Sequence, residues 1–185
     1  MTELALLGWE VGVSERTLRR AVNQGALRAA RPTPRTLDLP LAERRYIRRS
    51  WATLAALRAA LRTEQNVRLA VLFGSAARGT DAPASDLDLL VDLRDSRLER
   101  VVDLSLKLTE IMGRRVDVVR REDAETEPSL LLDILADGRV LVDRDALWPR
   151  LLGREAQLLC DAHRRQTTRA QAALAGIDDL LSTRA

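Results

Sequence analysis

The chain of 185 residues contains one cysteine, one histidine and 3% aromatic residues. A single cysteine, Cys160, cannot form an internal disulfide, and a single histidine, His163, leaves little from which to build a zinc site or a Ser–His–Asp triad. No apolar run approaches the roughly 20 residues that span a bilayer. The first residues place no basic stretch ahead of an apolar segment, so we expect no secretory signal, no membrane partner and a cytoplasmic location.

Lysine is also scarce, since Lys107 is the only one among 30 basic residues. It lies in an expected helix far from any glycine-rich turn, which excludes a Walker P-loop. The charge is uneven: residues 1–68 hold 13 arginines against 6 acids, whereas residues 69–143 hold 10 basic and 16 acidic residues. A basic first third followed by an acidic middle indicates two different tasks in one chain.

The first third predicts two helices, a turn and a short hairpin. Ser14 is a suitable N-cap for the second helix, and the prolines of RPTPR (31–35) favour a hairpin tip. This segment resembles a winged helix-turn-helix DNA-binding domain. The resemblance implies that the second helix enters the major groove while hairpin arginines lie along the phosphates. The candidate DNA contacts are Ser14, Arg16, Thr17, Arg19, Arg20, Asn23, Arg31 and Arg35. The alternatives are a helical adaptor with solvated arginines, or a module that grips RNA.

The remaining pattern predicts a small α/β (α+β) domain and a helical tail. A long amphipathic helix from Leu41 to about Glu64 connects the basic module to a middle region in which strands and helices alternate. We expect domains at 1–64 (the winged module with its connecting helix), 65–143 (the mixed-sheet domain) and 144–185 (the helical tail). The tail could pack on the sheet, or could form a homodimer or partner surface.

Two carboxylates open one of the expected strands. Asp86 and Asp88 share a face of the strand, with Cα atoms about 6–7 Å apart. Mg²⁺ prefers oxygen ligands and usually binds one or two carboxylates together with substrate phosphates. Without a cation the two acids would repel each other. The pair therefore indicates a metal site, against the alternative of a solvated strand end.

A glycine–serine turn precedes these acids by ten residues. Gly74 and Ser75 end a hydrophobic run, and a helix that starts there would offer backbone N–H groups to a phosphate. Arg78, about one turn further, can neutralise triphosphate charge. Asp117 stands between valines on a later strand, where an acid is costly unless paired or metal-bound. Placed beside Asp86 and Asp88, it would ligate the metal and help to draw a proton from an attacking hydroxyl.

This pattern resembles the DNA polymerase β superfamily of nucleotidyltransferases, in the short form of its minimal members. The resemblance covers roughly residues 67–142 and implies a nucleoside triphosphate on Gly74 and Ser75, with two Mg²⁺ ions on Asp86 and Asp88 that Asp117 joins. Members of the superfamily include antibiotic adenylyltransferases, enzymes that act on RNA ends, and antitoxins that attach AMP to a partner toxin, often of the HEPN class.

The leading hypothesis is a Mg²⁺-dependent nucleotidyltransferase that transfers a nucleotide, AMP from ATP foremost, to a protein hydroxyl. It would act in a toxin–antitoxin system, and its basic module would repress its own promoter. One alternative is a nucleotidyltransferase that acts on a small molecule such as an antibiotic, or on an RNA end. Another is a non-enzymatic transcriptional regulator whose domain senses a nucleotide.

Overall fold

The computed structural model describes residues 2–33 and 36–182, and Arg35 therefore lies outside the described residues. The first third forms two short helices, a two-stranded hairpin and one long helix. Ser14 precedes the second helix as expected, and its Oγ accepts a hydrogen bond from the Thr17 N–H at 3.2 Å. The elements are α1 (Glu3–Glu10), α2 (Glu15–Asn23), β1 (Ala30–Thr33), β2 (Thr36–Asp38) and α3 (Leu41–Thr63).

A four-stranded mixed sheet forms the centre of the molecule, in the order β5-β4-β3-β6. Strand β3 runs antiparallel to both β4 and β6, whereas β4 and β5 are parallel and are connected through α5 (Leu98–Met112). The strands are β3 (Val67–Phe73), β4 (Leu87–Leu93), β5 (Val116–Arg120) and β6 (Arg139–Asp143). The mixed α/β sheet domain that the sequence predicts is confirmed.

Helices cover both faces of this sheet. The apolar sides of α3 and α5 pack on one face, and α6, α7, α8 and the start of α9 pack on the other. Pro128 occupies the first turn of α7, where its missing N–H costs no hydrogen bond. The remaining helices are α4 (Gly74–Arg78), α6 (Arg121–Glu125), α7 (Pro128–Asp137), α8 (Leu147–Leu152) and α9 (Glu155–Ser182).

One hydrophobic core joins the basic module to the sheet. Leu18 of α2, Ile47 and Leu54 of α3 and Val67 of β3 are fully buried members of the same cluster. Trp51 belongs to it as well, with 8% of its surface exposed. The expected division between residues 64 and 65 stays a prediction, and continuous packing crosses it.

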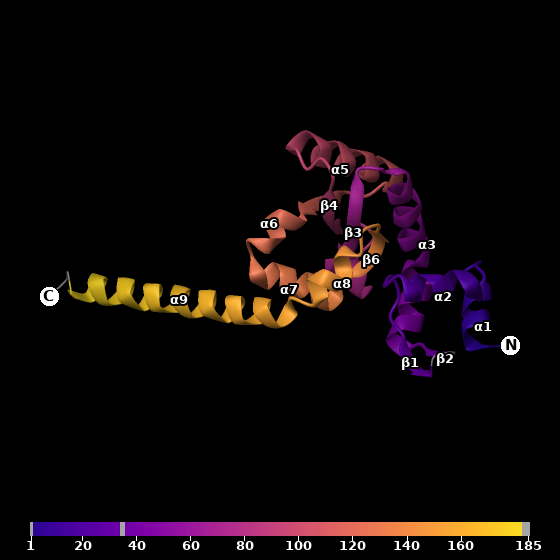
Figure 1. The fold of residues 1–185 in the computed structure, drawn as a ribbon, viewed down its shortest axis with the longest axis horizontal. Helices are drawn as coiled ribbons and strands as arrows, with labels where there is room; N and C mark the ends of the chain where they lie inside the picture. Colours follow the sequence, from indigo (N-terminus) through magenta and orange to yellow (C-terminus); the bar gives the residue numbers. More distant parts are fainter. Residues whose placement is uncertain (1, 34–35, 183–185) are drawn as a thin grey trace.

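The tail contains the short helix α8, which packs against the sheet, and the long helix α9, which leaves the body of the molecule and ends far from the N-terminus (Figure 1). The first turn of α9 stays attached because Leu158 is buried in the cluster beneath α7. Cys160 is exposed, because the chain has already left the sheet there. Within the part of the chain that the structure describes, no helix combines the length and the apolar composition that a membrane crossing requires.

Candidate active site

Two of the predicted site carboxylates lie side by side on neighbouring strands. Asp88 of β4 and Asp117 of β5 are direct partners in the parallel register. Because side chains alternate along a strand, Asp88 shares a face with Leu90, which packs against the α6–α7 layer. Asp86 lies two residues earlier, just before β4 begins. The three acids therefore gather at one end of β4 and β5, as the sequence predicts.

The glycine turn meets these acids directly. Phe73, the last residue of β3, pairs with Asp88 across the antiparallel ladder, and Gly74 follows with φ +70°. A Cβ atom at Gly74 would lie 2.4 Å from Asp88 Oδ2. The sequence attributes this glycine to the approach of a phosphate, whereas the structure shows that Asp88 itself requires the space. Glycine is therefore needed here for both the conformation and the contact.

The electrostatics at Asp88 are those of crowded carboxylates. Partial burial raises the pKa of Asp88, the neighbouring Asp117 and Asp86 raise that pKa further, and Arg78 opposes them. A cation placed among the three acids would relieve this repulsion.

Arg115 is a residue of this site that sequence analysis missed. Its Nε donates a hydrogen bond to Asp117 Oδ1 at 2.8 Å and lies 3.9 Å from Asp86 Oδ2. Within residues 2–33 and 36–182, no three acid, histidine or cysteine side chains are arranged as a metal-binding group, and Arg115 holds two of the three acids. The only sequence signal was an arginine two positions before Asp117, on the same face of the strand.

Arg114, also missed, fixes the loop that delivers Asp86. Its guanidinium forms an ion pair with Asp81 at 2.9 Å, and its Nε donates to the Ser85 carbonyl at 3.0 Å. Both partners belong to the connection between α4 and β4. This side chain therefore closes the loop over residues 81–85 immediately before Asp86.

The other predicted nucleotide contacts lie on α4. Ser75 is half-buried in the first turn of that helix, and no side chain caps its N-terminus. Arg78 is half-exposed at the last position, where it forms an ion pair with Asp137 of α7 at 2.7 Å. Arg78 is close enough to affect Asp88 electrostatically, although its guanidinium already has a carboxylate partner.

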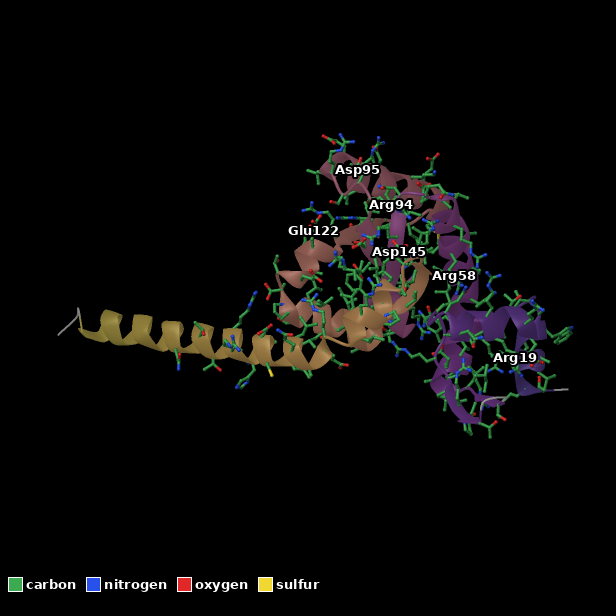
Figure 2. The ribbon with its side chains drawn as sticks, in the orientation of Figure 1. Arg19, Arg58, Arg94, Asp95, Glu122 and Asp145 are labelled. Carbon is green, nitrogen blue, oxygen red and sulfur yellow. The ribbon has the colours of Figure 1, made fainter. Side chains whose placement is uncertain are left out.

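The described members of the predicted DNA contacts lie at the start of α2, along α2 and on β1. Ser14, Arg16 and Thr17 are exposed at the start of α2, and Arg19 pairs with Glu15 on the same helix (Figure 2). The other described members, from the end of α2 and from β1, line a hollow that faces β6 and α8, and they are Arg20, Asn23 and Arg31.

Carboxylates on adjacent strands beside a glycine turn are the arrangement that the sequence resemblance predicts for a nucleotidyltransferase. Residues 56–147 match the family described as polymerase beta, nucleotidyltransferase. The chain therefore carries a nucleotidyltransferase domain of the polymerase beta family and is a nucleotidyltransferase, as the sequence resemblance implies. No curated protein matches the chain.

Solved structures are similar in fold. A structure described as a toxin–antitoxin with AMP-PNP matches at a TM-score of 0.52 and 23% identity, over 69% of this chain and 98% of that chain. A second match is the tri-AMPylated Shewanella oneidensis HEPN toxin in complex with MNT antitoxin, with a TM-score of 0.49 and 20% identity, over 71% of this chain and 98% of that chain.

Proposed function

We propose that the protein transfers AMP from ATP to a hydroxyl group of a partner protein, in the manner of an antitoxin that modifies a HEPN-type toxin. The observation that carries this proposal is the register of Asp88 with Asp117 beside Gly74. The structure described as a toxin–antitoxin with AMP-PNP supports the choice of nucleotide and of partner, because nearly the whole of that chain aligns with this one.

The donor set fits Mg²⁺. Two carboxylates with substrate phosphates are its usual environment. Burial and then the neighbouring Asp117 and Asp86 raise the pKa of Asp88, and a cation would offset the charge of these acids. Asp86 and Asp88 would hold the metal and Asp117 would join them. When bound, Mg²⁺ would stabilise the charge that develops on the attacking and leaving oxygens. Arg115 would release Asp86 and Asp117 as the metal and nucleotide enter, because it pairs with both acids.

The chain's own groups have distinct roles in this proposal. Asp117 accepts the proton of the attacking hydroxyl, whose oxygen then forms the bond to the α-phosphorus while pyrophosphate leaves. Gly74 and Ser75 hold the phosphates through the N–H groups of the first turn of α4. Arg78 offsets phosphate charge.

The test is label transfer. The protein is incubated with ATP labelled on the α-phosphate, Mg²⁺ and a purified HEPN-type toxin, and label on the toxin is measured. We expect labelling by the wild type and by Asp133→Asn, whose carboxylate is exposed on α7, but not by Asp86→Asn. Equal labelling with Asp86→Asn would contradict the proposed site. Labelling of an aminoglycoside or an RNA end, with none of the toxin, would contradict the proposed acceptor.

We propose a second role, DNA binding by the module at 1–64, in repression of the protein's own promoter. The capped and exposed start of α2 favours it, since Ser14, Arg16 and Thr17 stand free of the sheet. Arg16→Gln should weaken binding to a duplex of the upstream region, whereas Arg164→Gln on α9 should not. Equal affinities in a gel-shift assay would argue against the module.

A further inference from the structure

The hollow that Arg20, Asn23 and Arg31 line lies along β6, the edge strand of the sheet farther from Asp117. Its volume is about 830 Å³, which lies within the range typical of small-ligand sites. One wall comes from α2, β1 and α3, and the other comes from β6 and α8. We call it the arginine cleft and define it by Arg20, Arg31, Arg58, Arg62, Arg144 and Trp148.

Positive charge in the arginine cleft is poorly compensated. Among the residues that the structure describes, Arg20, Arg58 and Arg62 form no ion pair with an acid, although the chain forms many elsewhere. Of the described residues that line the cleft, Asp143 is the only acid. Its carboxylate accepts hydrogen bonds from the Leu147 and Trp148 N–H groups at the start of α8, at 2.9 and 3.1 Å.

Arg58 is the most unusual member. Only 7% of its surface is exposed where α3 meets α2 (Figure 2). Its Nη2 donates a hydrogen bond to Gln24 Oε1, whereas Nη1 is buried with no hydrogen-bond partner among the described residues. Burial, with Arg62 and Arg20 nearby, lowers the pKa of Arg58 to about 10. A buried, unpaired guanidinium costs free energy that a bound anion would offset.

The opposite wall of the cleft is largely apolar. Val140, Trp148, Pro149 and Leu152 line it, and Trp148 is half-buried. The two walls meet where the Val140 N–H donates to the Gly25 carbonyl at 3.0 Å, which joins β6 to the end of α2. A hollow with a basic wall and an apolar wall suits a compact ligand that carries several negative charges on an organic group.

We propose that the arginine cleft binds a phosphate-bearing small molecule of the nucleotide class, with its phosphates on Arg20, Arg58 and Arg62 and its organic part against Trp148. Guanidinium groups match phosphate oxygens in paired, charge-assisted hydrogen bonds. The site is separate from the carboxylates, because β3 lies between β4 and β6. It needs no metal, since its charges are already positive.

Calorimetry on the full chain in EDTA tests the proposal, with ATP and inorganic triphosphate as the probes. Without metal, the acids around Asp88 repel both probes, so binding reports on the cleft. We expect one ATP site, weakened about tenfold or more by Arg62→Gln and by Arg58→Met, because each removes charge-assisted hydrogen bonds. Arg45→Gln, which changes an exposed arginine of the same helix, should bind as the wild type does.

Several outcomes would overturn this inference. They are an absence of ATP binding in EDTA, equal binding by the wild type and Arg62→Gln, and equal loss in Arg45→Gln, which would indicate unspecific charge attraction. Triphosphate binding as tight as that of ATP would remove the role of Trp148. Loss of duplex DNA binding in Arg62→Gln, without any ATP site, would make the surface a nucleic-acid contact. Arg62 is exposed, so this variant is expected to fold. Asp86→Asn should leave this binding intact, which separates the cleft from the transferase activity.

Discussion

The buried ion pair between Glu43 and Arg139 offers a sharp test of how this fold is held together. Arg139 is 3% exposed and Glu43 is 4% exposed. The guanidinium forms two hydrogen bonds to the carboxylate, at 2.6 and 3.0 Å, and lies 3.3 Å from the centre of the Tyr46 ring. It also donates to the carbonyls of Ala77 at 2.6 Å and Ala26 at 3.2 Å.

Replacement of Glu43 by alanine would leave this guanidinium buried without its counter-charge. Removal of one partner of a buried pair costs about 3–5 kcal/mol. The loss would include the hydrogen bond that Glu43 Oε1 accepts from the Arg28 N–H at 3.0 Å. We expect the free energy of unfolding to fall by about 4 kcal/mol, a large share of the roughly 5–15 kcal/mol of an ordinary domain. Glu43→Gln keeps an acceptor for Arg28 and should lose less.

Urea unfolding of four proteins would measure this: the wild type, Glu43→Ala, Arg139→Met and the double variant. Because the two side chains act as a pair, the double variant should lose clearly less than the sum of the single losses. It should still be less stable than the wild type, since the Ala26 and Ala77 carbonyls lose their donor. Additive losses, or a loss below about 1 kcal/mol for Glu43→Ala, would refute the reasoning.

Three further predictions concern the active site. Gly74→Ala should reduce nucleotidyl transfer about 100-fold, because its Cβ would displace Asp88; wild-type turnover would disprove the close packing. Asp88→Asn should raise the metal-free melting temperature at pH 7. Because the pKa of Asp88 is raised in the folded protein, the wild type loses stability as the pH rises through that pKa. The stability gained by Asp88→Asn should therefore vanish in acid. A gain in melting temperature that persists in acid would contradict this explanation. Arg114→Leu should lower the free energy of unfolding in urea by about 1–3 kcal/mol, and it should lower activity because the loop before Asp86 loses its contacts. Unchanged stability and activity would show that Arg114 does not fix this loop.

The parts of the fold that were predictable from sequence depend on local signals. Pro128 marks the start of α7 because proline suits the first turn of a helix. The alternation around Asp117 places that acid on a strand, and the D-x-D spacing places Asp86 and Asp88 together at the start of β4. The short helix α6 was missed, since Arg121–Glu125 follows β5 without a glycine or proline to separate them.

Other contacts depend on residues that are far apart in the sequence and meet only in the folded chain. Glu43 and Arg139 are 96 positions apart, and nothing near either residue indicates the other. The ion pair between Arg114 and Asp81 likewise requires the loop after α4 to fold back over the start of β5. In this chain, where arginine accounts for nearly all the basic residues, composition cannot single out the few arginines that find buried partners.

The position of Arg139 changes the meaning of the division expected between residues 64 and 65. Its guanidinium donates hydrogen bonds to the Ala26 carbonyl of the basic module and to the Ala77 carbonyl of α4, the helix that begins at Gly74. Its counter-charge, Glu43, comes from α3 on the other side of that division. A chain cut at the boundary would leave Arg139 buried and unpaired. Packing and ion pairing therefore continue across the boundary, and we expect its two sides to unfold together.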